Sequence, residues 1–355
     1  MTLKELGYTD TLESCRKENG LDSFQVGRVI SEHKERYVVK NVEGEYDAEL
    51  VGNLRFTAES RYDFPAVGDW VAISEYDEDK ALIHAVFPRH SIIERRAVGK
   101  AAQKQIIATN VDVGLIVQAV DRDFSLNRLE RYLTICNAAK ISPVILLSKI
   151  DLISEPELDA ILKSVQDRIK GIQLLTISSE KENGYDQLKS LFNVGKTYCL
   201  LGSSGVGKST LLNQVSGREQ MKTGEINTSI NRGKHVTSHR EIIILDNGGI
   251  IIDNPGMREV GIGDSVEGLE TTFEAIVLFS KNCKFSDCTH MHEEGCAVLE
   301  AIDSGEIDEG VYSNYLKLMK EQAHLETSLE DKKKRDKRFG KLMKHVITHR
   351  KENKY

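Results

Sequence analysis

The sequence lacks any long hydrophobic run. Its longest apolar stretches, such as Val111 to Val120, have the length of a strand and fall far below the roughly 20 residues of a membrane-spanning helix. The segment from Met1 to Asp10 mixes charged and apolar side chains and contains no apolar run of the signal-peptide type. We therefore expect a protein of the cytoplasm that makes no contact with a membrane.

Cysteine, tryptophan and low-complexity sequence are also scarce. Six cysteines and one tryptophan occur in 355 residues, and cysteines of a cytoplasmic chain are more often thiols or metal ligands than disulfides. The net charge of −7 argues against a protein that coats nucleic acid by general positive charge, and it says nothing about local patches. A chain of 355 residues is too long to fold around one ordinary hydrophobic core, so we expect two or three domains.

The first zone, residues 1–90, contains five short runs of β type separated by glycine and acidic residues. These runs predict a small barrel, for which the OB-fold is the leading candidate. The zone has one tryptophan and no stripe of aromatic and basic residues, so the residues alone indicate RNA binding only weakly. The runs are Gln25 to Ile30, Arg36 to Lys40, Tyr46 to Val51, Asp69 to Ser74 and Ala81 to Val86.

The second zone, residues 91–263, alternates apolar strands with helical patterns, which predicts a mostly parallel sheet covered by helices. Ser154 is the expected N-cap of the helix from Glu155 to Lys170. The third zone, residues 264–355, is helical and polar, with a cysteine cluster and a basic run from Lys332 to Lys344. This run either contacts phosphates or forms a solvated helix face.

A glycine-rich loop in the second zone fits the pattern G-x-x-x-x-G-K-[ST], with a strand before it and a helix after it. Its backbone N–H groups and the following helix N-terminus suit a phosphate. Lys208 is expected to reach the β- and γ-phosphates as a catalytic residue, and the Ser209 hydroxyl to bind Mg²⁺. The expected nucleotide-binding residues here are Gly202, Ser203, Ser204, Gly205, Val206, Gly207, Lys208, Ser209 and Thr210.

A second phosphate motif, D-x-x-G, follows the apolar run from Ile250 to Ile252. Asp253 at the strand end suits Mg²⁺, usually through water, and the Gly256 N–H can approach the γ-phosphate. In the basic segment between the two motifs, Thr237 is the expected switch residue, which binds Mg²⁺ and acts in catalysis. The alternative for this segment is an ordinary basic loop.

The base-reading motif is Ser148-Lys149-Ile150-Asp151, which resembles N-K-x-D with serine in place of asparagine. Asp151 can accept two hydrogen bonds from the guanine N1–H and amine, which adenine cannot offer. Lys149 can pack over the base. Ser178 and Ser179 follow another predicted strand and suit the backbone contact to the base oxygen.

The order of these motifs is rotated. Most GTPases carry the phosphate motifs first, whereas here the base-reading motifs at 148 and 178 precede the phosphate motifs at 202, 237 and 253. A sheet places its loops in space independently of chain order. The motifs therefore keep their roles when the usual chain is cut after D-x-x-G and its old ends are joined. The motifs therefore predict a circularly permuted GTPase, with an ATP-using P-loop enzyme as a competing reading that Asp151 argues against.

The third zone places three thiols and one imidazole within 14 residues, as Cys283, Cys288, His290 and Cys296. Three cysteines and a histidine suit a tetrahedral, structural Zn²⁺ site. His292 is a weaker alternative ligand, and cysteines scattered through a helical domain are the competing interpretation.

The rotated order and the C-x₄-C-x-H-x₅-C cluster together resemble the RsgA (YjeQ) family of circularly permuted GTPases. The resemblance implies an OB-fold domain over 1–90, a permuted Ras-like domain over 91–263 and a helical zinc-binding domain over 264–355. It also implies a factor for late maturation of the small ribosomal subunit, with rRNA as a partner and hydrolysis stimulated by the subunit.

The sequence departs from that family's pattern at Asn247, where some relatives have a histidine suited to catalysis. Met257 stands where many GTPases place a glutamine that orients water, so His235 and His239 are the candidates that are left. The alternative function is an RNA-binding chaperone whose nucleotide site is mainly structural. We expect the protein to act as a monomer.

Overall fold

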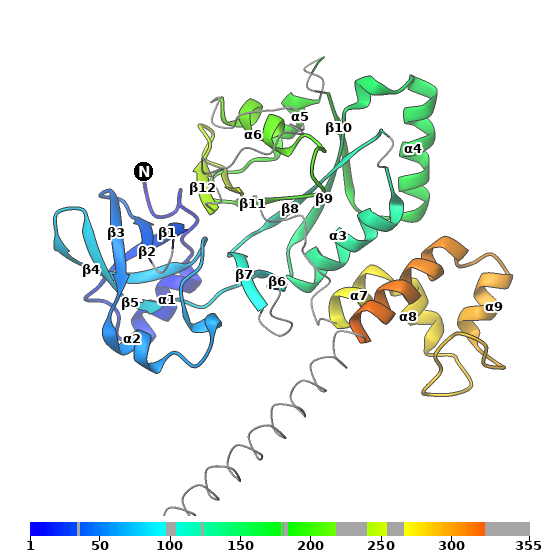
Figure 1. Ribbon diagram of the computed structural model, residues 1–355, viewed down its shortest axis with the longest axis horizontal. Coiled ribbons are helices and arrows are strands. Elements are labelled where there is room, and N and C mark those ends of the chain that lie inside the picture. The colour runs from blue at the N-terminus through cyan, green and yellow to red at the C-terminus, as the bar shows by residue number, and fades with distance from the viewer. Residues whose placement is uncertain are drawn as a thin grey trace, which may run out of the picture.

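A computed structural model describes residues 1–33, 36–96, 104–121, 124–178, 180, 184–217, 240–253 and 266–323. These residues form a β-barrel, a central sheet covered by helices, and a helical body packed beside helix α3 (Figure 1). None of the described helices is long and apolar enough to cross a bilayer.

The barrel closes because its first strand pairs with two others. Its strands follow the order β1-β2-β3-β5-β4, and β4 pairs back onto β1. Alternate residues of β3 point into the barrel core, as a strand with one buried face requires. The closed, OB-like barrel predicted for this zone is confirmed, and its strands are β1 (Gln25–His33), β2 (Arg36–Lys40), β3 (Glu45–Leu50), β4 (Trp70–Asp77) and β5 (Lys80–Val86).

Several short elements were missing from the sequence prediction. Helix α1 (Asp10–Glu18) begins at Thr9, whose hydroxyl accepts a hydrogen bond from the Leu12 N–H. Helix α2 (Gly52–Thr57) links β3 to β4. Two further strands, β6 (Ile92–Arg96) and β7 (Lys104–Thr109), form a separate antiparallel pair.

The central sheet has the order β10-β9-β8-β11-β13-β12. The first five strands run parallel, and only β12 is antiparallel to its neighbour β13. This arrangement agrees with the mostly parallel sheet that the sequence predicts. The strands are β8 (Val113–Ala119), β9 (Ser142–Ser148), β10 (Gln173–Ile177), β11 (Thr197–Leu201), β12 (Arg240–Ile244) and β13 (Ile250–Asp253).

Helices bury both faces of this sheet. On one face, α3 (Leu126–Ala138) and α4 (Glu155–Arg168) pack against a cluster that includes Ile116. On the other face, α5 (Tyr185–Leu191) and α6 (Lys208–Ser216) pack against a cluster that includes Leu115. The continuous apolar runs of the strands follow from burial on both sides.

The start of α4 is capped as its sequence predicts. The Glu157 carboxylate accepts hydrogen bonds from the backbone N–H and the hydroxyl of Ser154, at 2.8 and 2.7 Å. Pro156 stands in the first turn, where its missing N–H has no intrahelical partner to lose.

The barrel and the central sheet are joined through β1. Ser31 and Glu32 of β1 pair with residues at the start of β12, so that the strands form one continuous sheet. Arg28 of the same strand is buried at the junction, with 1% of its surface exposed. Its guanidinium donates to the carbonyl oxygens of Leu6, Gly68 and Asn110 and to the Thr197 hydroxyl.

Replacing Arg28 by methionine should destabilise the whole protein. Arg28→Met leaves four buried acceptors without this donor, which we expect to cost about 3–5 kcal/mol. Denaturant unfolding of the variant beside Arg61→Met, a change at an exposed arginine of the barrel, measures this cost. Equal stability of the two variants would contradict the role of the buried guanidinium.

The C-terminal body packs on α3. Its described helices are α7 (Val266–Thr272), α8 (Glu274–Ser280), α9 (Ala297–Asp303) and a helix over residues 309–323. A Cβ at Gly268 would lie 2.6 Å from that of Ala138, so α7 can approach α3 this closely only because it carries glycine there.

A buried polar cluster also holds the C-terminal body against α3. Glu130 of α3 binds Arg168 of α4 through two hydrogen bonds of 2.8 and 2.7 Å, and it accepts a third, of 2.5 Å, from Asn314. Nearby, Arg131 makes a bidentate pair with Glu321. The C-terminal body is therefore held on the helices of the central sheet by charged groups as well as by packing.

Candidate nucleotide site and candidate metal centre

Most of the predicted nucleotide residues that the structure describes lie at one edge of the central sheet. Ser148 ends β9, Ser178 follows β10, and the glycine-rich loop follows β11, all at the carboxyl ends of parallel strands of one sheet. Open α/β sheets bind ligands outside these ends. The rotated motif order therefore still produces a single site.

The glycine-rich loop begins in close contact with β8. At Gly202, a Cβ would lie 2.3 Å from the Val117 carbonyl oxygen, and the φ angle is +149°, so a side chain there has no room. The loop then enters α6 through Gly207, which has a left-handed conformation. The first turn of α6 thus begins at Lys208, directly after the loop, and the N-terminus of a helix favours an anion.

Lys208 lies across its own loop. Its ammonium group donates to the Gly202 carbonyl at 2.7 Å and also to the Ser203 carbonyl. The Lys208 side chain is only half-buried, and Ser209 next to it is exposed. The loop thus carries an ammonium group and an accessible hydroxyl side by side.

Ser148 connects the base-reading loop to the phosphate-binding loop. Its hydroxyl donates to the Val206 carbonyl oxygen at 2.7 Å, across 58 residues of sequence, and the residue is 4% exposed. The sequence pattern placed Ser148 among the nucleotide-binding residues, as a serine in the position of the usual asparagine. Its pairing with Val206 depends on tertiary structure, and no local signal in the sequence indicates it.

Asp151 is held by the neighbouring predicted motif. It lies in a short helix, η2 (Ile150–Leu152), and its Oδ1 accepts a hydrogen bond of 2.5 Å from the Ser178 hydroxyl. Sequence analysis assigned Ser178 a backbone contact to the base, whereas the structure adds this side-chain role. Lys149, in a left-handed conformation, pairs with Asp121 at 3.4 Å.

Removing the Ser148 hydroxyl should weaken guanine-nucleotide binding more than it slows hydrolysis. In Ser148→Ala the Val206 carbonyl loses its donor, and we expect GDP affinity to fall about tenfold because the two loops are no longer tied together. Titration with fluorescent GDP tests this, with Ser164→Ala on α4 as the control. Unchanged GDP affinity, with the protein still folded, would argue against the link.

Asp253 leaves the sheet beside the phosphate-binding loop. It is the last residue of β13, which pairs in parallel with β11 so that Ile252 lies opposite Cys199. Burial, assisted by the charge of Asp253, raises the pKa of the Cys199 thiol to about 12, so this cysteine stays neutral. Cys199 and Cys136 are both fully buried in the core, as expected for packing residues.

Several predicted site residues lie outside the described part of the chain. They are Ser179, His235, Thr237, His239, Gly256 and Met257, together with the basic run from Lys332 to Lys344. Their roles stay predictions from the sequence.

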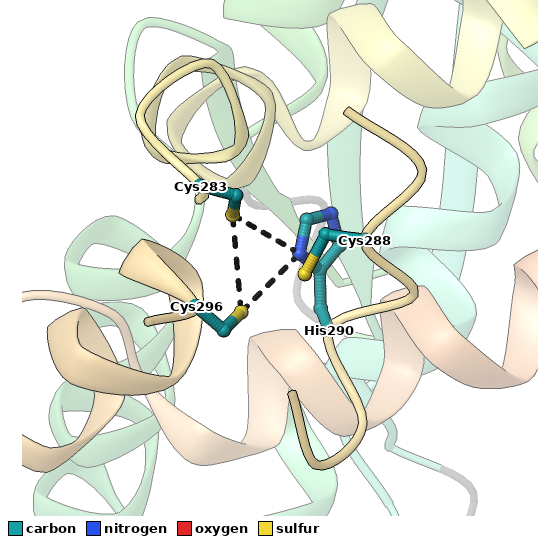
Figure 2. Close-up of side chains that lie close together, drawn as sticks. All are labelled: Cys283, Cys288, His290 and Cys296. Carbon is teal, nitrogen blue, oxygen red and sulfur yellow. Dashed lines mark hydrogen bonds between the residues drawn. The ribbon is translucent and has the colours of Figure 1, made fainter. Parts of the chain in front are cut away.

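The four predicted metal ligands converge in the C-terminal body (Figure 2). The ligand atoms of Cys283, Cys288, His290 and Cys296 all lie within 4.8 Å of one another. Cys283 Sγ and Cys296 Sγ are 3.9 Å apart, and each lies close to His290 Nδ1, at 3.6 and 3.4 Å respectively. His292, the weaker alternative, is exposed and is not among the four.

These distances can be compared with a tetrahedral zinc site. Zn–S bonds of about 2.3 Å and Zn–N bonds of about 2.0–2.1 Å place two sulfurs about 3.8 Å apart and sulfur about 3.5 Å from nitrogen. The three separations among Cys283, His290 and Cys296 agree with these values, and Cys288 Sγ lies within 4.8 Å of the other three ligand atoms. Burial lowers the pKa of His290, which keeps its imidazole in the neutral form that binds metals.

The loop that carries His290 is fixed by its own hydrogen bonds. The Glu293 carboxylate accepts from the backbone N–H groups of Thr289, Met291 and His292, at 2.9, 2.9 and 3.1 Å. The Tyr312 hydroxyl donates to the His290 carbonyl oxygen from the helix over residues 309–323. The ligand set is thus built into the core of the C-terminal body.

Fold and site together define a P-loop GTPase whose motifs are circularly permuted. A family model described as RsgA GTPase matches residues 86–263. The chain belongs to the RsgA GTPase family, and the resemblance inferred from its motifs is confirmed. A model described as ABC transporter also matches residues 185–345, a range that contains the same phosphate-binding loop.

Curated relatives extend the similarity to nearly the whole chain. The small ribosomal subunit biogenesis GTPase RsgA of Opitutus terrae is 38% identical over 334 residues, covering 91% of this chain and 90% of the relative. The small ribosomal subunit biogenesis GTPase RsgA 2 of Lactiplantibacillus plantarum is 40% identical over 327 residues, again covering 91% and 90%.

Solved structures show the same architecture. The crystal structure of YjeQ from Thermotoga maritima matches with a TM-score of 0.63 and 26% identity, covering 84% of this chain and 98% of that one. YloQ, described as a circularly permuted GTPase, matches with a TM-score of 0.63 and 25% identity, covering 85% and 96%.

Proposed function

We propose that the protein binds the small ribosomal subunit and assists its late maturation, hydrolysing GTP to GDP and phosphate when the subunit stimulates it. The names of the relatives support the ribosomal part of this proposal. The hydrogen bond from Ser148 to the Val206 carbonyl carries the enzymatic part, because it holds a base-reading loop against a phosphate-binding loop.

In this proposal the base and the phosphates are held by different strands. Asp151, oriented by Ser178, accepts hydrogen bonds from the guanine N1–H and amine, and Lys149 packs over the ring. Ser179 offers its backbone N–H to the base oxygen. This pattern selects guanine over adenine.

The phosphates are held by the loop after β11. Its N–H groups surround the β-phosphate, and Lys208 leaves its carbonyl partners to pair with the β- and γ-phosphates. Ser209, Thr237 and Asp253 would hold Mg²⁺, and the ion would supply positive charge beside the phosphates. The Gly256 N–H contacts the γ-phosphate.

The proposal also includes a structural metal, the division into domains, the partner and the candidates for positioning water. Cys283, Cys288, His290 and Cys296 would hold one structural Zn²⁺, supported by the convergence of their ligand atoms within 4.8 Å of one another. The domains follow the divisions at 1–90, 91–263 and 264–355, and the protein works as a cytoplasmic monomer on rRNA. His235 and His239 are candidates for positioning the attacking water.

Co-sedimentation with purified small subunits tests this function. We expect the protein to bind small subunits at least about tenfold more tightly with a non-hydrolysable GTP analogue than with GDP, because nucleotide state controls docking. Large subunits serve as the control. Equal binding in both nucleotide states would favour the alternative of an RNA chaperone with a structural nucleotide, and equal binding to both subunits would contradict the ribosomal assignment.

A further inference from the structure

Two adjacent residues connect the base-reading loop to the rest of the nucleotide edge. Ser148 reaches the phosphate-binding loop, where its hydroxyl donates to the Val206 carbonyl oxygen. Lys149 reaches the end of β8, where its ammonium group lies 3.4 Å from the Asp121 carboxylate. Among the described residues, Asp121 is the one partner of this ammonium group. The sequence motifs give Asp121 no role, although it holds the side chain that is expected to cover the base.

The pairing of two strands brings these side chains together. β8 and β9 are parallel neighbours, and Ala119 lies opposite Ser148 at their ends (Figure 1). The Val120 N–H then donates to the Ser148 carbonyl oxygen at 3.1 Å. Asp121 and Lys149 are the next residues of the two chains, so both leave the sheet at the edge where the predicted nucleotide residues lie.

The segment that carries Asp121 is held at both of its ends. The Asp121 carbonyl oxygen accepts a hydrogen bond of 2.9 Å from the Phe124 N–H, and Phe124 packs against the core cluster that includes Ile116. Gln118 of β8, which is 1% exposed, donates from Nε2 to the Ser125 carbonyl oxygen at 3.1 Å. The carboxylate therefore has a defined place relative to the base-reading loop.

The backbone of Lys149 has a left-handed conformation, with φ of 60° and ψ of 35°. Residues other than glycine seldom adopt it, and those that do concentrate at functional sites. At Lys149 this turn joins β9 directly to the short helix η2, which carries Asp151 in its hydrogen bond with Ser178. One short loop thus presents both the expected base-reading carboxylate and the lysine that pairs with Asp121.

We propose that Asp121 is a positioning residue for the guanine nucleotide, which holds the Lys149 ammonium group so that the methylene stem lies along the base. This inference rests on the proposed function, in which Lys149 packs over the ring. A lysine stem can pack on an apolar face while its charged end binds elsewhere. A partner that restricts the rotamers of Lys149 before the nucleotide arrives reduces the conformational entropy lost on binding.

A double-mutant cycle tests the proposal. Asp121→Asn, which keeps the shape and removes the charge, should raise the Kd for GDP about threefold, since the side chains of the pair are 36% and 28% exposed and solvent weakens their attraction. Lys149→Met should raise this Kd at least about threefold. In the Lys149→Met background, adding Asp121→Asn should cause no further change, because the interaction is already lost. Titration of the full-length protein with fluorescent GDP in Mg²⁺ gives all four affinities.

Two further measurements separate positioning from general damage to the site. The ratio of the affinities for GDP and inosine diphosphate, which lacks the exocyclic amine, should be the same in Asp121→Asn as in the unchanged protein, whereas Asp151→Asn should reduce it. Raising the salt concentration should narrow the difference between Asp121→Asn and the unchanged protein. Asp159→Asn, at an exposed aspartate of α4, is the control and should bind GDP normally. Melting curves verify that each variant is folded.

Three results would overturn the proposal. These are an unchanged GDP affinity in Asp121→Asn, an equal effect of this substitution with and without Lys149→Met, and an altered ratio for the two diphosphates in Asp121→Asn. Each of them leaves the proposed GTPase function in place. Failure of the unchanged protein to bind guanine nucleotide would instead contradict the proposed function, and this inference with it.

Discussion

Lys208→Ala should lower the rate of GTP hydrolysis by on the order of a thousandfold. The ammonium group is the one side-chain cation placed within the phosphate-binding loop among the described residues, where it bonds the Gly202 carbonyl. In the variant, the negative charge that develops on the β- and γ-phosphates no longer has an ammonium group as its partner. Phosphate release under single-turnover conditions measures the effect.

The matched control for this change is Lys163→Ala, at an exposed lysine of α4. This variant should hydrolyse GTP at the rate of the unchanged protein. Hydrolysis by Lys208→Ala at more than about a tenth of that rate would show that phosphates bind elsewhere.

Loss of the metal centre should unfold the C-terminal body and leave the central sheet folded. Cys296 is 2% exposed and packs in the core of that body, so Cys296→Ala removes a ligand and opens the centre of its packing. Structural zinc sites contribute apparent binding energies of about 10–16 kcal/mol to folding in small domains. Hydrogen exchange over residues 266–323, with zinc content measured by metal analysis, tests this expectation.

Cys15→Ala provides the control, because Cys15 lies in α1, outside the converging set. This variant should retain one zinc per chain and its C-terminal protection. Unchanged protection of residues 266–323 after verified loss of zinc would falsify a structural role for the metal.

The parts of the fold that the sequence predicted are those set by local pattern. The strands of the barrel and of the central sheet alternate or run continuously apolar, and Ser154 carries the signal of a helix start. The pair β6–β7 and helix α1 were missed, because their short runs mix charged and apolar residues.

The contacts that complete the site, and those that join the barrel to the central sheet, depend on residues distant in sequence. Ser148 meets Val206 across 58 residues, and Arg28 meets Thr197 across 169 residues. Periodicity and motif spacing report only neighbours along one element, so neither contact follows from them. The convergence of the three cysteines and His290 was predictable because all four lie within one loop region, where spacing itself carries the information.

Hydrolysis of GTP by the purified protein, with and without small ribosomal subunits, tests the central claim most directly. The account predicts slow hydrolysis alone, because Met257 cannot orient water, and at least about a hundredfold stimulation by small subunits that large subunits do not reproduce. GTP should be hydrolysed and ATP should not, since Asp151 selects guanine. Equal rates with and without small subunits, or equal use of ATP, would contradict the account.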